Sequence, residues 1–582
     1  MRFTDQKTPV LPRKIERTIQ DLPREVILRI FCELDLQGLH TCMLVSHAFN
    51  GLIQESGLLQ YRIELWSNGM LDGPAGIPRF QSSKSRHKAL LELQDSWFNL
   101  RPRKETRLES ANQGTRYDFA SGVLARGYAS DDPEGARAWL RNLPSVLRDH
   151  EQSTIFHEEG ISNSVDYIID PTQDLLMLAE QLTEPDRGFC FKPRTLSGNA
   201  QHPQTNVEDF QYIIPHWLNL RPEHDIEDWK LAPLFQVSGR MVVLTITSSF
   251  GDQMEPNILV VFDWKTGELL GTYHSCSHAI TSFLVVTPTL IVTSEYNPSY
   301  TRRHYNPHPR LLLLELQMDA RGKSKLTHVQ TLRFPSFQHS TIGHKALLVI
   351  IDFDITAGCG PLSPPQSPSC AYPFRPDPAA SLAVVSLTLH LYKDREAALP
   401  PEHHSFHFLV PIGTILTART IKMPSIPSSA SIVDPLTSGM LPPPIAVRGL
   451  DWEEWGAKDN GACILSVDPE ADLCASYGSR YAKLDSDGTG LVVIDFSPYV
   501  QAKVKDSDGE WVDEDRVLRK LVNTASMLSD AGREDCRKIF DADLGILSFA
   551  AMMTTVPVAD WILMDAEHIL FMRGDHVDVW TM

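Results

Sequence analysis

Near the amino terminus, apolar residues recur at the spacing of an amphipathic helix. From Val26 onward they occupy positions i, i+1, i+4, i+5 and i+8, with charged residues between them. Pro23 suits the first helical position, where its missing N–H would be unpaired anyway. After a break at Asp35–Gly38, two further apolar stretches predict two more helices of roughly ten residues each. Three short helices cannot bury all this apolar surface among themselves, so we expect another domain or chain to cover part of it.

The order of landmark residues in this segment resembles the F-box family. That family opens on Leu-Pro-x-Glu-(Ile/Val), ends its first helix in Leu, places a second Leu after it, and continues with Val-Ser and an aromatic residue. The matching positions here are Leu22, Pro23, Glu25, Val26, Leu34, Leu39, Val45, Ser46 and Phe49. Phe49 stands where the family often has Trp. The Phe side chain keeps an apolar ring but lacks the indole N–H. The continuation Leu58–Leu65 looks like F-box proteins of fungal type.

The resemblance implies that this segment binds the Skp-type adaptor of a cullin-RING ubiquitin ligase. The chain would then be the non-catalytic substrate-recognition subunit of a Skp–cullin–F-box (SCF) ligase, bound through the adaptor to a cullin, while the remaining residues select a protein substrate. Eight residues are expected to supply the buried adaptor contact: Leu22, Pro23, Val26, Ile27, Ile30, Leu39, Val45 and Phe49. Three alternatives stay open, namely an F-box scaffold that acts outside the cullin ligase, a three-helix cap without a partner, and an independent enzyme.

A connector and one more helix follow the F-box segment. Residues 67–80 are rich in Gly and Pro, which predicts a linker. The apolar stripe from Leu90 to Leu100, with Ser85 as a potential cap, predicts a helix that docks the F-box onto the rest of the chain. We therefore expect four regions: a polar tail at 1–20, the F-box at 21–66, a linker and docking helix at 67–106, and a body at 107–582.

In the body the apolar pattern changes to short, β-branched runs separated by turn signals. The clearest hairpin is Ile258–Leu270, in which Gly267 can take the positive φ of a tight turn. Many short strands and few long helices predict a large all-β domain, which we interpret as a β-propeller. At roughly 45 to 60 residues per blade, six to eight blades fit. The pairs Asp263-Trp264 and Asp451-Trp452 resemble blade ends of WD-type propellers. Two β-sandwiches in series are the alternative.

The ends of the body and three irregular stretches complete the prediction. We expect the last strands, near His568–Trp580, to pair with the first, near Tyr117–Ala125, and so to close the ring and hide its edges. Two Pro-rich stretches, 357–378 and 423–444, predict long surface loops. Ser-Pro pairs in the first of them are candidate phosphorylation sites. The run Arg516–Leu528 predicts a surface helix.

Composition and charge argue against several classes of partner. The net charge is −19, which disfavours a nucleic-acid surface, because such surfaces are usually basic. Nine cysteines without a CxxC pair indicate reduced thiols. The first 20 residues have no apolar core of a signal peptide, and no apolar run is long enough to span a membrane. We therefore expect a cytoplasmic or nuclear protein with neither nucleic acid nor membrane as a partner.

Several groups of potential ligands or catalytic residues have simpler structural explanations. His274–His278 and Glu402–His407 fall on predicted strands or strand ends, and His304–His308 lacks the HExxH pattern of a zinc helix. Asp485–Gly490 imitates a calcium loop without the Glu at its twelfth position. Gly322–Ser324 lacks the first glycine of a phosphate-binding loop. We therefore expect no catalytic, cofactor or metal site and no enzymatic activity.

Overall fold

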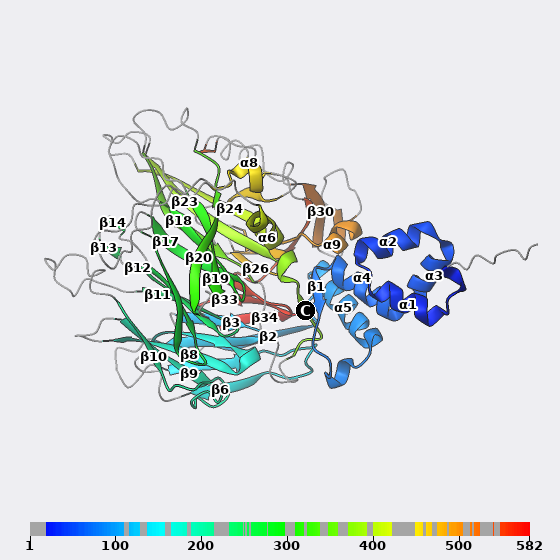
Figure 1. Cartoon of the computed structure of the whole chain (residues 1–582), viewed down its shortest axis with the longest axis horizontal. Coiled ribbons are helices and arrows are strands. Elements are labelled where there is room, and N and C mark those ends of the chain that lie inside the picture. The colour runs from blue at the N-terminus through cyan, green and yellow to red at the C-terminus, as the bar shows by residue number, and fades with distance from the viewer. Residues whose placement is uncertain are drawn as a thin grey trace, which may run out of the picture.

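A helical module lies at one end of the long axis of the computed structural model, and a large β body forms the rest (Figure 1). The structure describes residues 19–109, 116–128, 137–157, 164–182, 188–214, 232–247, 249–250, 253–254, 258–275, 278–296, 309–318, 323–337, 347–358, 371–392, 400–421, 449–457, 461–467, 474–485, 488–504, 512–514, 517–523, 539–540, 548–574 and 576–582. The expected tail before residue 19 and the loop 423–444 lie outside these residues.

The helical module contains one helix more than the three predicted. After a short 3₁₀ turn at Ile19–Asp21, its helices are α1 (Arg24–Cys32), α2 (Leu36–Val45), α3 (His47–Glu55) and α4 (Gly57–Ser67). Polar side chains cap α2 and α3, because the Asp35 carboxylate accepts from the Gly38 amide at 2.7 Å and the Ser46 hydroxyl from the Phe49 amide at 3.5 Å. Pro23 is the N-cap of α1 rather than its first residue.

The module has a small core of its own. Its buried apolar side chains come from all four helices, and the rings of Phe31 and Phe49 meet edge to face at 5.3 Å. The members of this core are Ile27, Phe31, Leu39, Phe49, Ile53 and Leu59. A core of this size fixes the arrangement of the helices and leaves other apolar side chains outside it.

The β body is a ring of seven antiparallel sheets, counted among the described residues, and it is the β-propeller that the strand pattern predicted, within the range of six to eight blades. In order from the axis outward, blade 1 is β3 (Arg116–Ala120), β4 (Val123–Tyr128), β5 (Arg137–Asn142) and β6 (Ser153–His157); blade 2 is β7 (Ser164–Asp170), β8 (Leu175–Leu182), β9 (Gly188–Thr195) and β10 (Phe210–Ile213); blade 3 is β11 (Ala232–Ser238), β12 (Met241–Thr247), β15 (Ile258–Asp263) and β16 (Glu268–His274).

The remaining blades continue around the axis. Blade 4 is β17 (Ala279–Thr287), β18 (Leu290–Tyr296), β19 (Arg310–Met318) and β20 (Ser324–Arg333); blade 5 is β21 (Leu347–Thr356), β23 (Leu382–Tyr392), β24 (Glu402–Pro411) and β25 (Cys463–Val467); blade 6 is β26 (Cys474–Tyr477), β27 (Arg480–Leu484), β28 (Gly490–Asp495), β31 (Ser548–Thr555), β30 (Val517–Asn523) and β29 (Val512–Glu514); blade 7 is β32 (Trp561–Met564), β33 (His568–Met572), β34 (His576–Thr581) and β2 (Lys104–Glu109).

Burial on both faces explains why central strands are continuously apolar. In β15 every residue is buried, and successive residues face different neighbours. Val260 packs in the core shared with blade 2, whereas Val261 packs in the core shared with blade 4.

The predicted hairpin is confirmed, because β15 and β16 are joined by a turn in which Gly267 has a φ of 72°. Of the two Asp-Trp pairs, the second begins the short helix α8 (Trp452–Trp455) rather than ending a blade.

The ring is closed by strands from the two ends of the body. β34 pairs with β33 on one side and with β2 on the other, in register from Lys104 opposite Thr581 to Glu109 opposite His576. Closure by the last strands is therefore confirmed, but the expected partner was wrong. Tyr117–Ala125 forms part of β3 and β4, in the following blade. The β body also begins at Lys104, three residues before the expected position.

The linker and docking helix lie between the helical module and the propeller (Figure 1). They consist of β1 (Met70–Asp72), a 3₁₀ turn at Pro78–Phe80 and α5 (Ser83–Phe98), whose N-cap is Ser82 rather than Ser85. As predicted, the stripe from Leu90 to Leu100 is buried, and it shares a core with side chains of blades 6 and 7. The helix therefore docks the module onto the body.

Two predicted irregular stretches contain strands. From the expected loop 357–378, residues 374–376 form β22, which pairs with β1, while 359–370 lie outside the described residues. From the expected helix Arg516–Leu528, residues 517–523 are the strand β30. The spacing of its apolar residues is compatible with a helix as well as with a strand. The backbone pairing with β29 and β31 makes it a strand.

Candidate functional site

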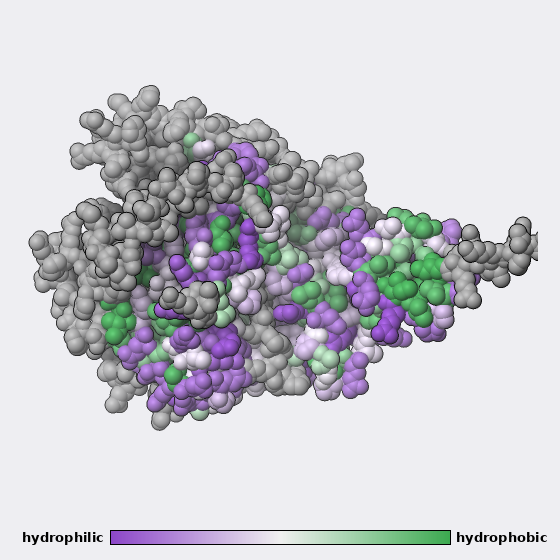
Figure 2. Space-filling model, viewed as in Figure 1, coloured by the Kyte–Doolittle hydropathy of each residue, from purple (hydrophilic) through white to green (hydrophobic). Residues whose placement is uncertain are grey.

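The helical module leaves a set of large apolar side chains exposed to solvent. Leu44 is 89% exposed and Val45 72% exposed, at the end of α2. Leu22 is exposed just before α1, and Val26 and Ile30 are exposed along the outer side of that helix. We call these five residues the apolar face. Figure 2 shows hydrophobic surface gathered over the helices that carry them, at the end of the molecule away from the propeller. Exposed apolar surface gathered in this way is typical of a protein interaction site.

The eight residues expected to contact a partner divide into two groups. Five lie at the surface, namely Leu22, Pro23, Val26, Ile30 and Val45. The other three, Ile27, Leu39 and Phe49, are buried in the core of the module. The expectation that these three supply the contact is therefore corrected, because their side chains are already covered by the chain itself.

The geometry of α1 explains the division. Residues four apart lie on one side of a helix, so Val26 and Ile30 point outward together, while Ile27 and Phe31 point together into the core. The sequence stripe thus contains two faces, one internal and one external. Periodicity alone does not say which of the two is external.

Sequence reasoning missed the most exposed apolar residue of the module, Leu44. Leu58 and Ile19 are also exposed and were not expected to be so. A signal was present, because Cys42–Val45 are four consecutive apolar residues within a helix. Consecutive residues point in different directions around a helix, so a single core cannot bury all four.

Charged contacts hold the helices that present the apolar face. Arg62 of α4 donates hydrogen bonds to the carbonyl groups of Cys32 and Leu34 at the end of α1, and its guanidinium lies over the ring of Trp66. Cations near the last carbonyl groups of a helix are stabilising. On the surface, Arg24 pairs with Glu55 of α3 at 2.7 Å. The outward side of α1 is therefore set by contacts from two other helices.

The docking helix holds the module against blades 6 and 7. The indole N–H of Trp97 donates to the Ala566 carbonyl at 3.2 Å, and the Arg480 guanidinium lies 4.7 Å from the centre of the Trp97 ring. Arg480 also donates to Gln94 of the same helix and pairs with Asp495 at 2.9 Å, where both side chains are buried. The helical module that bears the apolar face is therefore joined to the propeller through a helix whose buried side chains pack against blades 6 and 7.

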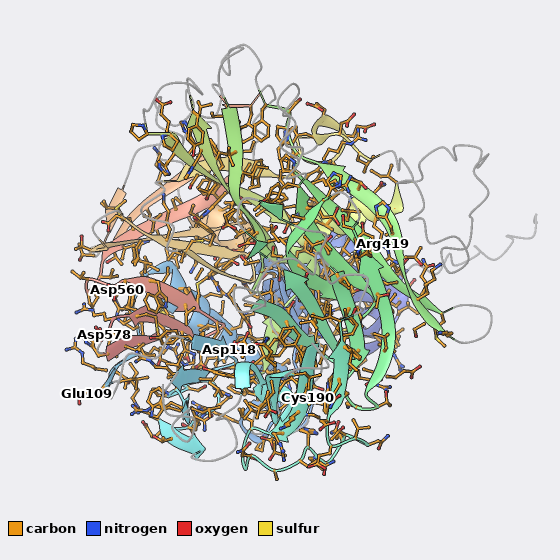
Figure 3. All side chains as sticks on the ribbon, turned by 90° about the vertical axis from the view of Figure 1, so that its left-hand side faces the viewer. Glu109, Asp118, Cys190, Arg419, Asp560 and Asp578 are labelled. Atoms are coloured by element: carbon orange, nitrogen blue, oxygen red, sulfur yellow. The ribbon has the colours of Figure 1, made fainter. Side chains whose placement is uncertain are left out.

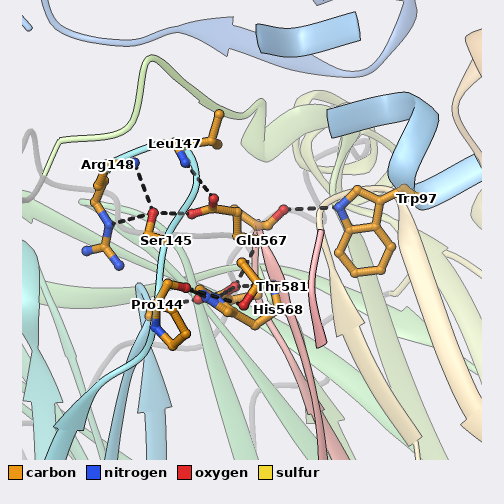
Figure 4. Close-up of polar contacts among 11 residues, drawn as sticks. Trp97, Pro144, Ser145, Leu147, Arg148, Glu567, His568 and Thr581 are labelled. Atoms are coloured by element: carbon orange, nitrogen blue, oxygen red, sulfur yellow. Dashed lines mark hydrogen bonds and ion pairs between the residues drawn. The ribbon is translucent and has the colours of Figure 1, made fainter. Parts of the chain in front are cut away.

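A buried set of Ser, His and acidic side chains lies beside this anchor (Figure 4). Ser145 donates to the Glu567 carboxylate at 2.5 Å, and the two ring nitrogens of His568 contact the Asp565 carboxylate and the Pro144 carbonyl, each at 2.8 Å. Burial alone would lower the pKa of His568, but the Asp565 and Glu567 carboxylates outweigh it and raise that pKa. This favours the charged imidazolium.

The arrangement of this set is structural rather than catalytic. In nucleophilic catalysis a histidine accepts the proton of the serine hydroxyl, whereas here Ser145 bonds to Glu567 and both nitrogens of His568 have other partners. His568 is also fully buried. The set joins blade 1 to the strand turn of blade 7, and so it strengthens the ring where the chain closes it.

The axis of the propeller contains a cavity of about 250 Å³ lined by residues of the inner strands and their turns. Asp118, labelled near the ring centre in Figure 3, accepts a hydrogen bond from the Ile169 amide of the next blade at 2.6 Å. Burial raises its pKa to about 6. The other lining carboxylates also have partners within the chain, since Asp170 caps the 3₁₀ turn of Pro171–Gln173 and Asp565 pairs with His568. Asp118 and Asp565, which accepts from the Gly122 amide of blade 1, thus join neighbouring blades, whereas Asp170 fixes a turn within its own blade.

The other groups of potential ligands singled out in the sequence make contacts within the propeller. The rings of His403 and His390 meet edge to face with their centres 4.0 Å apart, and His407 contacts the Tyr481 hydroxyl at 2.7 Å. The carboxylate of Asp485 accepts from the Thr489 amide at 2.8 Å in a strand turn. Cys276, His304 and the other residues of the 304–308 group lie outside the described residues. Within the described part of the chain, no three His, Cys, Asp or Glu side chains are grouped so as to hold a metal ion.

Comparisons with known proteins identify the helical module and do not identify the whole chain. Residues 19–65 match the model of the F-box-like family. No curated protein matches the chain. Among the described residues, no helix has the length and apolar character needed to cross a membrane.

Two solved structures that resemble the chain do so at low similarity. One is the β-propeller domain of the Trilobed protease from Pyrococcus furiosus, with 8% identity and a TM-score of 0.23 over 51% of this chain and 77% of that one. Another is the tail fiber of Staphylococcus aureus phage P68, with 12% identity and a TM-score of 0.18 over 58% and 71%. The propeller assignment therefore rests on the strand order and register of this chain.

Proposed function

We propose that this chain, which carries an F-box-like domain followed by a seven-bladed β-propeller, is the substrate-recognition subunit of an SCF-type ubiquitin ligase. In this role the apolar face binds a Skp-type adaptor, the adaptor links the chain to a cullin, and the propeller binds a protein substrate. Ubiquitin transfer is carried out by other subunits, so the chain itself is not an enzyme. The F-box-like match at residues 19–65 supports this role.

The observation that carries the proposal is the exposure of the apolar face. Leu44, Val45 and the outer side of α1 remain exposed although the module has a buried core of its own. Fully burying one such side chain contributes about 1.5–3 kcal/mol. Several together can support a specific contact, although association and side-chain ordering offset much of the gain. A few central residues should therefore carry most of the affinity.

Substituting the most exposed pair tests this contact. We expect the double variant Leu44→Asp/Val45→Asp to recover at least about tenfold less purified Skp-type adaptor than wild type, because two charges would be buried without partners. Both side chains lie outside the core of the module, so its fold should be kept. The measurement is a pull-down with purified proteins.

A matched control separates this effect from a general loss of solubility. Val558 is 55% exposed in the propeller, between β31 and β32, and Val558→Asp makes the same kind of change. This variant should recover as much adaptor as wild type. Equal recovery by all three proteins would contradict the proposed contact.

Assembly with a cullin is tested separately. We expect a cullin to co-purify with the chain only when the adaptor is present, and the reconstituted complex to ubiquitinate the chain itself. We place the protein in the cytoplasm or nucleus, and five free cysteines in the described residues are in keeping with a reducing compartment. Recovery of adaptor without cullin would instead identify a scaffold that acts outside the ligase.

A further inference from the structure

A strand from the propeller is added to the linker that carries the F-box-like module. β22 lies between the first two strands of blade 5 in sequence, but it pairs with β1, with Met70 opposite Pro376 and Asp72 opposite Phe374. Two more backbone hydrogen bonds extend the ladder, from the Gly73 amide to the Pro373 carbonyl at 2.9 Å and from the Asp377 amide to the Gly69 carbonyl at 2.8 Å. The propeller thus holds the linker by its backbone.

One buried arginine gathers the pieces of this junction. The Arg86 side chain on α5 is nearly covered, and its guanidinium pairs with the Asp72 carboxylate of β1 at 2.5 Å. It also donates to the Pro373 carbonyl beside β22 at 3.0 Å. Its remaining acceptors are linker carbonyl groups, those of Gly73, Pro74 and Phe80. A planar group with five N–H donors suits such a junction, and a lysine could not reproduce it.

The helical module reaches the same point through α4. The hydroxyl of Tyr61 donates to the Asp72 carboxylate at 2.8 Å and lies 3.4 Å from the Pro373 carbonyl. Asp72 therefore accepts from Tyr61 of the module and from Arg86 of the docking helix. Three elements on the module side, α4, β1 and α5, are joined to one segment of the propeller.

The propeller side of the junction is equally well packed. Phe374 is buried in the core that contains Leu90 and Trp97 of α5 together with residues of blades 6 and 7. The ring of Tyr372, just before β22, lies 4.7 Å from the Arg148 guanidinium of blade 1. The contact of Tyr372 with Arg148 does not involve the linker, so β22 has an attachment to the ring of its own and can act as an anchor.

We propose that Arg86 and β22 form a latch that fixes the F-box-like module at one distance and orientation relative to the propeller. Arg86 is a positioning residue, because it contacts neither the apolar face nor the propeller axis. A Gly- and Pro-rich linker without such contacts would let the two domains move relative to each other. In a ligase the latch would hold the substrate at a set distance from the catalytic subunit. That consequence rests on the proposed function, whereas the latch itself is independent of it.

Two substitutions open the latch by different routes. Arg86→Met removes the guanidinium and keeps the apolar stem. In Gly73→Val the added Cβ would lie 2.2 Å from the Tyr372 carbonyl oxygen, so the linker and β22 must separate. Lys84 is exposed on the same helix as Arg86, and Lys84→Met is the matched control. None of these residues belongs to the apolar face.

The test measures the distance between the two domains in the full chain. Dyes are attached through unnatural amino acids at Gln54 on α3 and at Glu268 on β16, which are both exposed, and the distance distribution is obtained by energy transfer. We expect one narrow distribution for wild type and Lys84→Met, and distributions at least about twofold wider for Arg86→Met and Gly73→Val, because unlatched domains move by default. Distributions as narrow as wild type in both variants would overturn the proposal.

Two further measurements keep this test decisive. Amide exchange in the wild-type chain does not depend on how any variant folds: slow exchange at Gly73 and Asp377 supports the latch, and exchange as fast as in an open loop overturns it. Adaptor recovery by Arg86→Met and Gly73→Val is measured in parallel. It bears only on the proposed function, because a latch can open or hold whether or not the adaptor binds.

Discussion

Removing residues 568–582 is expected to abolish cooperative unfolding of the β body. These residues form β33 and β34, and their loss leaves β2 and β32 without neighbours and opens the ring. It also removes His568 and its contacts to blade 1. An open ring exposes two unpaired edges and an unfilled core. Circular dichroism on heating should show a gradual change, and a cooperative transition at the parent temperature would contradict closure by β34.

A point variant tests the same closure without a deletion. Val579 is buried in β34 between Leu570 of β33 and Thr106 of β2. Val579→Asp buries a carboxylate without a partner, and we expect it to lower the free energy of unfolding by more than about 3 kcal/mol. Glu105, which is exposed on β2, provides the control. Glu105→Ala should stay within about 0.5 kcal/mol of wild type, and an equal effect of the two would argue against a buried closing strand.

The second large effect is expected at the buried ion pair below the docking helix. Arg480→Met leaves the buried Asp495 carboxylate without its counter-charge, and removing one partner of a buried pair typically costs about 3–5 kcal/mol. The variant also loses the contacts of Arg480 to Gln94 and to the Trp97 ring. Denaturant unfolding of the full chain measures the loss.

Two comparisons establish that burial causes this effect. Arg107→Met breaks an ion pair of similar length, with Asp578 at 2.7 Å, but the Arg107 side chain is 59% exposed, so its loss should cost about 1 kcal/mol or less. The double variant Arg480→Met/Asp495→Leu should recover much of the stability lost in Arg480→Met, because no buried charge remains. Similar losses for Arg480→Met and Arg107→Met would contradict this account.

The sequence predicted those parts of the fold that depend on residues close together in the chain. The landmarks around Leu22–Phe49 predicted the helical module and its family resemblance. The stripe from Leu90 to Leu100 predicted the docking helix, and the short apolar runs predicted a propeller. These features depend on the period of apolar residues along a few turns or one strand, and that period can be read without knowing the partner element.

Features set by distant contacts could not be read in this way. β2 closes the ring with β34, although several hundred residues separate them, and nothing local in Lys104–Glu109 distinguishes it from other candidate strands. β22 was assigned to a surface loop because the stretch 357–378 around it is rich in proline. The one proline in the strand, Pro376, fits because the sheet has only two strands, and an outward edge needs no N–H donors.

The candidate site was predictable in outline and not in detail. The sequence indicated that the helices carry more apolar surface than they can bury, which the exposure of Leu44 and Val45 bears out. It did not separate the inner side of α1 from the outer, so Ile27 was placed in the contact together with Val26. The difference is a rotation of one residue, about 100° around the helix axis, and only the packing of the other helices settles it.

The most direct test of the account is hydrogen–deuterium exchange of the full-length chain with and without a purified Skp-type adaptor. Binding to the apolar face should slow amide exchange in α1 and α2, where Val26, Ile30, Leu44 and Val45 lie, and leave the propeller strands unchanged. Unchanged exchange in α1 and α2 at saturating adaptor, or protection confined to the propeller, would contradict the claim that these helices form the adaptor-binding surface.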